Sequence, residues 1–307
     1  MQEPWKFHPL NHNLPRFKKK YLFAGLGTMG HPMAGHLSKN KNLDLYVYNR
    51  TVDVTHRWLN KHDGFEFNFN NSSDMKFNGL ITCLKDDDSI VDILINKRLV
   101  KYLQKNSFII DHSTTSLQLV DLINSNDEAT ENNISFFDAP VSGGEVGAIN
   151  GTLSIMYGGP NKKISIIESI MNSYSNKITK IGPSGHGQLT KMVNQLCIAG
   201  LLQGLSEGVA LGKSSNLNMT KVLEGISGGA AQSWQMDNRF KTMVDGNFNF
   251  GFAVDLMIKD LKIAIKQSNS NNLDLTISKK VLKKYEMLSK EKMGNLDTSS
   301  LIKLFDV

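Results

Sequence analysis

The sequence Gly25-Leu26-Gly27-Thr28-Met29-Gly30 has the pattern G-x-G-x-x-G and decides the fold of the first half of the chain. The apolar run 21–24 precedes it, and apolar residues at helical spacing follow from Met33 onward. Strand, glycine turn and helix therefore come in the order of a dinucleotide-binding βαβ unit. In such a unit Gly25 permits the tight turn, Gly27 lets the backbone approach a pyrophosphate, and Gly30 lets the helix pack closely on the strand. The alternative is a chance glycine loop.

Short apolar runs alternate with longer amphipathic stretches from residue 21 to about residue 181, a pattern typical of βαβ units. The predicted strands are 21–24, 43–48, 80–84, 108–111, 134–138 and 153–157. We therefore expect an α/β fold with a doubly wound, Rossmann-type parallel sheet.

The pattern changes after Gly182-Pro183-Ser184-Gly185. Apolar residues recur at helical spacing from Leu189 to Leu211 without a proline, and further helical patterns cover 257–267 and 277–291. We expect an all-helical C-terminal domain. Its first helix is so apolar that we also expect it to pack against a partner subunit, in a homodimer or homotetramer.

Length and composition agree with a folded protein of two domains. The chain has 307 residues, of which 40% are hydrophobic and 21% charged. The predicted division is a basic N-terminal extension at 1–19, an NAD(P)-binding Rossmann domain at 20–183, and a helical substrate and dimerisation domain at 184–307.

The net charge of +6 is concentrated in the predicted extension. The first twenty residues hold five basic residues against one acid, and a short basic tail before a first strand is usually a solvated extension. We therefore expect no nucleic-acid partner. Without an apolar run long enough for a signal peptide or a membrane span, we expect no membrane association and a cytoplasmic protein, with an organelle signal as the weaker alternative.

Cys83 and Cys197 are the two cysteines, too few and too far apart for a disulfide framework or a cysteine metal cluster. The run Asp86-Asp87-Asp88 resembles a metal site only superficially, because successive side chains diverge. We expect it to begin a helix, where acids suit the positive end of the helix dipole. No metal is predicted.

The second predicted strand ends in Asn49-Arg50-Thr51, where NAD enzymes carry an acid for the ribose 2′-hydroxyl. A guanidinium and two neutral polar side chains suit a 2′-phosphate, which an acid would repel. The pattern favours NADP over NAD, with Asn49, Arg50 and Thr51 as cofactor-binding residues. The alternative is that Thr51 only caps the next helix and Arg50 faces water.

Two further segments hold candidate substrate groups. Asp138-Ala139-Pro140-Val141-Ser142-Gly143-Gly144 ends a predicted strand at the sheet edge where ligands bind, and Ser142 with the glycine N–H groups could grip a carboxylate. An ordinary turn explains the same residues equally well. Lys191 and Asn194 lie three apart on the long helix, and an ammonium there could donate a proton to a carbonyl oxygen. A solvated lysine is the alternative.

These segments together resemble the β-hydroxyacid dehydrogenase family, which includes 3-hydroxyisobutyrate dehydrogenase, tartronate semialdehyde reductase and the glyoxylate/succinic semialdehyde reductases. The similarity covers nearly the whole chain from residue 21. It rests on the residues 25–34, 138–144, Gly-Thr-Leu-Ser-Ile-Met-Tyr-Gly-Gly at 151–159, the Lys191 segment, and Phe252 through Lys259-Asp260-Leu261.

The resemblance implies a role for each matching residue. Lys191 is then the catalytic acid/base, while Ser142, Gly143 and Gly144 hold the substrate carboxylate and Asn194 supports the site. Lys259 reaches the cofactor with Asp260 beside it, although both could equally be surface residues. Trp234 falls where the family's helical domain faces the cleft and could wall off the substrate, but a core or interface tryptophan is equally plausible.

The chain departs from the family pattern at two places. Many members have an Asn pair after the lysine, where this chain has Asn194-Gln195, so the role of the second position is open. The usual proline after Ser-Thr of the fifth strand is also absent, because Ser113-Thr114-Thr115-Ser116 continues into Leu117. Both departures leave the reaction class intact and weaken any choice of substrate.

The sequence thus predicts an NAD(P)-dependent oxidoreductase that interconverts a small 3-hydroxy acid and its semialdehyde. An imine reductase would share the fold, but such relatives generally replace the lysine. A non-catalytic NADP-binding interaction protein is the other alternative, and it too would be marked by loss of Lys191.

Overall fold

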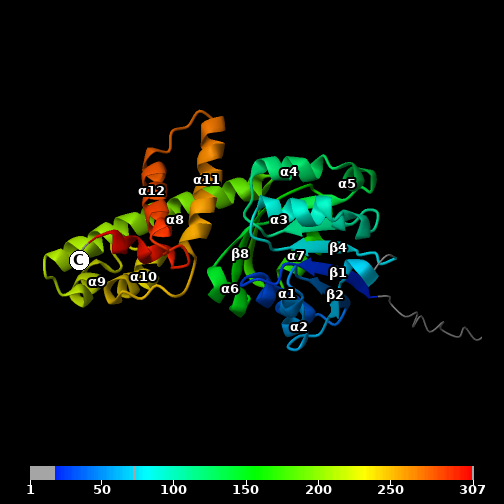
Figure 1. The fold of residues 1–307 in the computed structure, drawn as a ribbon, viewed down its shortest axis with the longest axis horizontal. Helices are drawn as coiled ribbons and strands as arrows, with labels where there is room; N and C mark the ends of the chain where they lie inside the picture. The colour runs from blue at the N-terminus through cyan, green and yellow to red at the C-terminus, as the bar shows by residue number, and fades with distance from the viewer. Residues whose placement is uncertain (1–17, 72–73, 306–307) are drawn as a thin grey trace, which may run out of the picture.

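The computed structural model describes residues 18–71 and 74–305. Most of the predicted basic extension, including Lys6 and Arg16, lies outside the described residues. Figure 1 shows two bodies side by side, a sheet layered with helices and a helical body, with the long helix α8 (His186–Ser214) running from one into the other.

The sheet has the strand order β3-β2-β1-β4-β5-β6-β8-β7, with β9 pairing to β8. Its first six strands are all parallel, and 3-2-1-4-5-6 is the order of a Rossmann fold. These strands are β1 (Lys19–Ala24), β2 (Leu43–Tyr48), β3 (Phe65–Glu66), β4 (Gly79–Thr82), β5 (Phe108–Asp111) and β6 (Ser135–Asp138). The sheet then continues as β8 (Leu153–Gly158), β7 (Val141–Ser142) and β9 (Ser175–Gly182). Strand β8 runs antiparallel to β6 and β7, so the predicted Rossmann sheet has a mixed edge beyond its six parallel strands.

Both faces of the parallel part are buried, which is why its strands are apolar at successive positions. In β1 the side chains of Tyr21 and Phe23 enter one core and those of Leu22 and Ala24 enter the other. The helices of this domain are α1 (Gly30–Ser38), α2 (Val52–Leu59), α3 (Asp87–Val91), α4 (Leu117–Asn124), α5 (Asp127–Glu131), α6 (Gly144–Asn150) and α7 (Ile164–Met171). Short turns of other helix types are η1 (Phe69–Asn71), η2 (Asp92–Asn96) and η3 (Leu99–Tyr102).

Every predicted strand is present, with ends displaced by at most two residues, but β9 and the two-residue strands β3 and β7 were not predicted. Strand β9 pairs only with β8 and alternates between exposed and partly buried residues, so Lys177 and Lys180 dilute its apolar signal. Among the acids 86–88, Asp86 is the N-cap of α3 and accepts a hydrogen bond from the Ser89 N–H, which confirms that the run begins a helix.

The second body consists of α8, α9 (Met219–Ile226), α10 (Trp234–Asp245), α11 (Val254–Ser270), α12 (Thr276–Lys290) and η4 (Thr298–Leu304). Apart from one isolated bridge between Ala253 and Asp297, residues 186–305 form no β-structure, as predicted. Leu202, Phe240, Leu261, Tyr285 and Leu301 from these helices share one buried core. No helix among the described residues is long and apolar enough to cross a membrane.

Candidate active site

The glycine turn joins β1 to α1, and its three glycines have different surroundings. Gly25 has a φ of +102°, and a Cβ there would collide with the Cys83 carbonyl oxygen, so this position requires glycine. A Cβ on Gly30 would collide with the Gly25 carbonyl oxygen. A Cβ on Gly27 would meet nothing within 4 Å. The turn is therefore tightly packed on its inner side and open at Gly27, which fits close approach of a dinucleotide pyrophosphate.

The segment 49–51 lies directly behind this turn. Asn49 Oδ1 accepts a hydrogen bond of 3.1 Å from the Leu26 N–H, and Asn49 Nδ2 donates to the Thr51 carbonyl oxygen. Asn49 therefore braces the glycine turn. Thr51 is the N-cap residue of α2, and Arg50 between them is exposed. Of the three predicted residues, Arg50 has its charged group free to meet a ligand.

Asp138 at the end of β6 fastens the start of α8 to the sheet. Its buried carboxylate accepts hydrogen bonds from the Gly185 N–H at 2.7 Å and the Gln188 N–H at 2.9 Å. Burial raises the pKa of Asp138, and these N–H donors oppose that shift. The sequence interpretation missed this helix cap. A strand-end acid facing a Gly-rich helix start is the signal that could have revealed it.

Lys191 lies one turn into α8, with its side chain directed at the loop after β6. It is buried, with 8% of its surface exposed, and its Nζ donates a hydrogen bond of 2.9 Å to the Val141 carbonyl oxygen. Val141 directly precedes Ser142, Gly143 and Gly144. The structure thus brings the predicted proton donor to the predicted carboxylate loop, although the two are about fifty residues apart in the sequence.

Asn194 and Gln195, on the next turn of α8, differ in burial and in hydrogen-bond partners. Gln195, four residues after Lys191, is 2% exposed, and its Nε2 donates a hydrogen bond of 2.7 Å to Asp260 Oδ2. Asn194 is partly exposed and donates from Nδ2 to Gln195 Oε1 at 2.8 Å. The sequence interpretation singled out Asn194 and left Gln195 open. The i, i+4 spacing from Lys191 could have identified Gln195 as its helix neighbour.

Lys259 and Asp260 of α11 reach the same region from the other side. Lys259 Nζ lies 2.9 Å from Asp260 Oδ1 and donates a hydrogen bond of 2.6 Å to the Thr114 carbonyl oxygen, just after β5. Gln188 holds the same loop, because it accepts from the Thr115 N–H and donates to the Ser113 carbonyl oxygen. Side chains of the helical domain therefore hold the loop that lacks the usual proline.

Trp234 is not brought together with these residues. It begins α10, which packs on α8, α9 and η4, and its side chain is 59% exposed. The Arg239 guanidinium lies 5.0 Å from the centre of the Trp234 ring and 4.9 Å from the centre of the Phe250 ring. Within one chain Trp234 therefore covers an arginine of its own domain.

Buried polar groups support the sheet edge beneath the site. Asp111 Oδ1 accepts hydrogen bonds from Thr82 Oγ1 and the Ser113 N–H, while its Oδ2 is buried without a partner. Burial raises the pKa of Asp111 to about 6. His112 contacts the Ala139 carbonyl oxygen through Nδ1 and the Tyr174 hydroxyl through Nε2, and burial lowers its pKa to about 4. His112 is therefore neutral, with Nδ1 donating.

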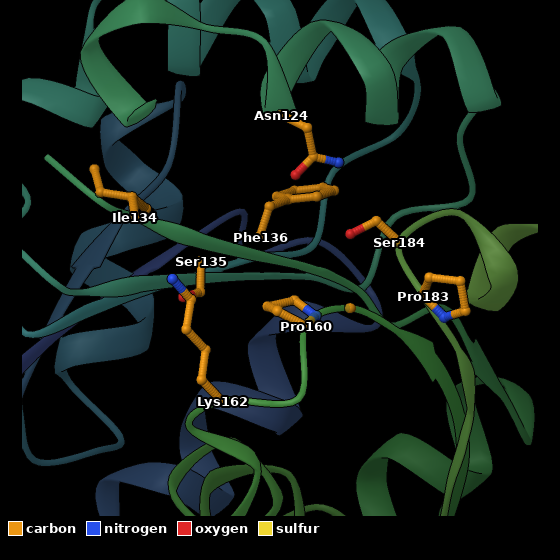
Figure 2. Close-up of a pocket in the computed structure, with 9 residues that line it drawn as sticks. Asn124, Ile134, Ser135, Phe136, Pro160, Lys162, Pro183 and Ser184 are labelled. Atoms are coloured by element: carbon orange, nitrogen blue, oxygen red, sulfur yellow. The ribbon is translucent and has the colours of Figure 1, made fainter. Parts of the chain in front are cut away.

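A separate surface pocket of about 390 Å³ lies beside β6 (Figure 2). Its walls are formed by Asn124, Ile134, Ser135, Phe136, Gly159, Pro160, Lys162, Pro183 and Ser184. None of the predicted site residues lines it. The candidate active site is instead the region between the glycine turn, the Ser142 loop and the start of α8.

Comparison with known families covers both domains. Residues 20–182 match the NAD-binding domain of 6-phosphogluconate dehydrogenase, and residues 185–305 match the NAD-binding domain of NADP-dependent 3-hydroxyisobutyrate dehydrogenase. The chain belongs to the β-hydroxyacid dehydrogenase family. As a β-hydroxyacid dehydrogenase it is an NAD(P)-binding oxidoreductase, as the sequence predicted.

Relatives of this β-hydroxyacid dehydrogenase match it along nearly their whole length. An oxidoreductase of Shewanella frigidimarina is 41% identical over 92% of this chain and 97% of its own. The 2-hydroxy-3-oxopropionate reductase of Escherichia coli is 26% identical over 94% of this chain and 97% of its own. The Mycobacterium tuberculosis 3-hydroxyisobutyrate dehydrogenase structure with L-serine has a TM-score of 0.84 at 21% identity, covering 94% of this chain and all of that one. That likeness confirms the fold.

Proposed function

We propose that this β-hydroxyacid dehydrogenase interconverts a small 3-hydroxy acid and its semialdehyde, with Lys191 transferring the proton. The observation that carries the proposal is the hydrogen bond between Lys191 Nζ and the Val141 carbonyl oxygen. It places a buried ammonium beside Ser142, so two segments about fifty residues apart together supply a proton donor and a carboxylate-binding loop. The relatives named as 2-hydroxy-3-oxopropionate reductase and 3-hydroxyisobutyrate dehydrogenase support this substrate class.

Lys191 is suited to give a proton to a carbonyl oxygen as that oxygen becomes an alcohol. Burial lowers its pKa, the Asp260 carboxylate raises it, and Lys259 lowers it further. A lysine whose pKa moves toward neutrality gives up its proton more readily than an exposed one and can take it back in the reverse direction. The acceptor carbonyl of Val141 keeps the ammonium directed at the loop.

Ser142, Gly143 and Gly144 form the proposed carboxylate site. Gly143 and Gly144 have φ values of +121° and +61°, a conformation that favours glycine and turns successive backbone groups toward one side. The Ser142 hydroxyl adds a donor. We assign Asn194 to the substrate side of the cleft because its side chain is partly exposed there.

The proposed cofactor is NADP, seated on residues 25–30. NADPH, when bound, supplies the hydride for reduction. Arg50 is the proposed partner of the 2′-phosphate, because it is exposed at the end of β2 and no acid stands beside it in 49–51. Asn49 and Thr51 shape this end of the strand. Lys259 is proposed to contact the cofactor from α11, since its Nζ already reaches the loop after β5.

The proposed reaction can be tested by following NADPH oxidation with glyoxylate and with succinic, tartronate and methylmalonate semialdehydes. We expect turnover of tartronate or methylmalonate semialdehyde, whose products are 3-hydroxy acids, faster with NADPH than with NADH. Cyclic imines are the comparison substrates, because an imine reductase would reduce those and leave the semialdehydes. Stoichiometric NADPH binding without turnover of any substrate would contradict an enzymatic function.

We further propose a homodimer or homotetramer in which α8 packs against its counterpart. Val193, Leu201 and Leu211 on α8 are 60%, 46% and 69% exposed. Gly200, Gly204 and Gly208 lie on the same exposed side, where a Cβ would meet nothing within 4 Å, so another helix could approach closely. In analytical ultracentrifugation we expect the wild type to sediment as a dimer or tetramer. We expect a Gly204→Glu variant to dissociate into monomers. A monomeric wild type would contradict it.

The remaining proposals concern organisation and place in the cell. We propose that the domains divide at residues 183–184, which is supported by the start of α8 at His186. The predicted extension 1–19 is one residue too long, because Lys19 already belongs to β1, and its residues 1–17 lie outside the described residues. A cytoplasmic location is supported by the two free cysteines. Fractionation of cells that express the full chain tests this location.

A further inference from the structure

Gln195 is a buried amide with both of its polar atoms in use. It lies on the Lys191 face of α8, four residues further on. Its Nε2 donates to Asp260 Oδ2 at 2.7 Å and its Oε1 accepts from Asn194 Nδ2 at 2.8 Å. Buried amides with two committed partners have one orientation, so Gln195 is a rigid link between α8 and α11.

Asp260 is held between this amide and a lysine. The carboxylate is 2% exposed, its Oδ2 accepts from Gln195, and its Oδ1 lies 2.9 Å from Lys259 Nζ. Lys259 is in turn held by the Thr114 carbonyl oxygen. If Gln195 released its hydrogen bond, the ion pair with Lys259 would be the closest remaining attraction on the carboxylate, and it would draw Asp260 toward Lys259.

The position of Asp260 matters because few charges act on Lys191. They are Asp260, which favours the ammonium, and Lys259, which disfavours it, both from α11. From the sheet side, Lys191 faces the neutral Val141 carbonyl, and Asp138 is committed to the N–H groups at the start of α8. A shift of the Asp260 carboxylate toward Lys259 would weaken its support of the ammonium.

We propose that Gln195 is a positioning residue that holds the Asp260 carboxylate where it supports the charge of Lys191. This inference rests on the proposed function of Lys191 as the proton donor. Gln195 has no part in binding substrate here, since its amide is occupied by Asp260 and Asn194.

The test compares the pH profile of reduction in wild type, Gln195→Leu, Asp260→Asn and the double variant. Loss of the Asp260 charge should move the alkaline limb of kcat to lower pH by about 1 unit. Gln195→Leu should move it in the same direction by less. In the Asp260→Asn background Gln195→Leu should add no further shift, because the carboxylate through which it acts is gone.

Gln203→Leu is the matched control, a buried glutamine two turns further along α8 that pairs with Glu207. This variant should have the alkaline limb of its kcat profile at the same pH as the wild type. Melting temperature and NADPH affinity verify that each variant is folded. A Gln195→Leu variant with lower kcat but an unmoved limb, or a shift that persists without the Asp260 charge, would overturn the inference.

A second readout keeps the inference separate from the proposed function. Carbamylation of Lys191 by cyanate, followed by mass spectrometry over a pH series, reports the ionisation of this amine without any turnover. We expect the carbamylation profile to move to lower pH in Gln195→Leu, as for kcat. A wild type that reduces no substrate contradicts the proposed function alone, whereas an unmoved carbamylation profile contradicts the role of Gln195 alone.

Discussion

Lys191 Nζ lies 2.9 Å from the carbonyl oxygen of Val141, the residue directly before Ser142. This hydrogen bond joins the first turns of α8 to the loop after β6, and the Asp138 carboxylate joins the same two elements a few residues earlier. The proposed proton donor and the proposed carboxylate loop are thus held as one unit, which is the arrangement that the following predictions test.

Replacing Lys191 by alanine should lower kcat by about 10²- to 10⁴-fold, because the developing alkoxide loses its proton donor. NADPH affinity should change little, since the glycine turn is untouched. Steady-state kinetics and a fluorescence titration measure the two effects. Lys266→Ala, an exposed lysine of α11, serves as the control. Full turnover by Lys191→Ala would refute the proposed mechanism.

The two directions of the reaction should depend on pH in opposite ways. Burial lowers the pKa of Lys191 from 10.5, and reduction needs the protonated amine. The reduction rate should therefore fall as pH rises through this lowered pKa, and the oxidation rate, which needs the neutral amine, should rise over the same range. Profiles of log kcat for both directions check this. Two profiles with the same slope would rule Lys191 out as the titrating group.

Alanine at Gly27 and at Gly30 should separate binding from folding. At Gly27 a Cβ meets nothing within 4 Å, so stability should be unchanged while NADPH binds at least about tenfold more weakly, because the methyl group occupies the path of the pyrophosphate. At Gly30 a Cβ collides with the Gly25 carbonyl oxygen, so the melting temperature should fall. Thermal unfolding and NADPH titration of both variants distinguish the two effects, and equal loss of stability would contradict this assignment.

Replacing Arg50 by alanine should weaken NADPH more than NADH. A charge-assisted hydrogen bond to the 2′-phosphate is worth about 1.5–3 kcal/mol, which corresponds to a loss of about tenfold or more in NADPH affinity. NADH lacks that phosphate and should bind as before. Arg57→Ala, an exposed arginine of α2, is the matched control. Equal weakening of both cofactors would show that Arg50 does not read the 2′-phosphate.

Asp111→Asn should stabilise the protein above pH 6. Burial raises the pKa of Asp111 to about 6 from its ordinary value of 3.8. The stability that this group contributes is present below pH 4 and is lost as pH rises through about 6, because the folded state then holds a buried charge. Asparagine never ionises, so the variant should exceed the wild type by about 3 kcal/mol at pH 7 and match it near pH 4.

Denaturant unfolding of both proteins over a pH series measures this difference. Asp245→Asn, at an exposed acid of α10, is the matched control. A difference between wild type and Asp111→Asn that stays constant from pH 4 to pH 7 would mean that Asp111 is ionised without penalty.

The parts of the site that could be predicted depend on short stretches of chain. The glycine turn was predicted because turn, strand and helix are neighbours in sequence and each glycine serves a local need. The acids 86–88 were predicted to begin a helix for the same reason, and Asp86 caps α3. Strand β9 was missed because an edge strand exposed on one side carries a weak apolar signal.

Other features depend on which distant segments meet. The sequence left the second residue of Asn194-Gln195 open, and the structure decides it, because Asp260 of α11 packs across from Gln195 and not from Asn194. It could not show that Asn49 braces the glycine turn from behind, nor that Trp234 covers Arg239 in its own domain. Each of these depends on the direction of a side chain relative to an element far away in sequence.

The sequence by itself determined the two-domain fold, the glycine turn between the first strand and the first helix, and the family of the chain. The fold and the turn follow from local backbone requirements and from apolar periodicity along consecutive residues, and the family follows from the resemblance of several motifs to those of known members. Only the tertiary structure decided that Lys191 meets the Val141 carbonyl, that Asp138 caps α8, and that Gln195 holds Asp260. The reason is physical: buried polar groups must find partners wherever packing brings them, and packing is a property of the whole chain.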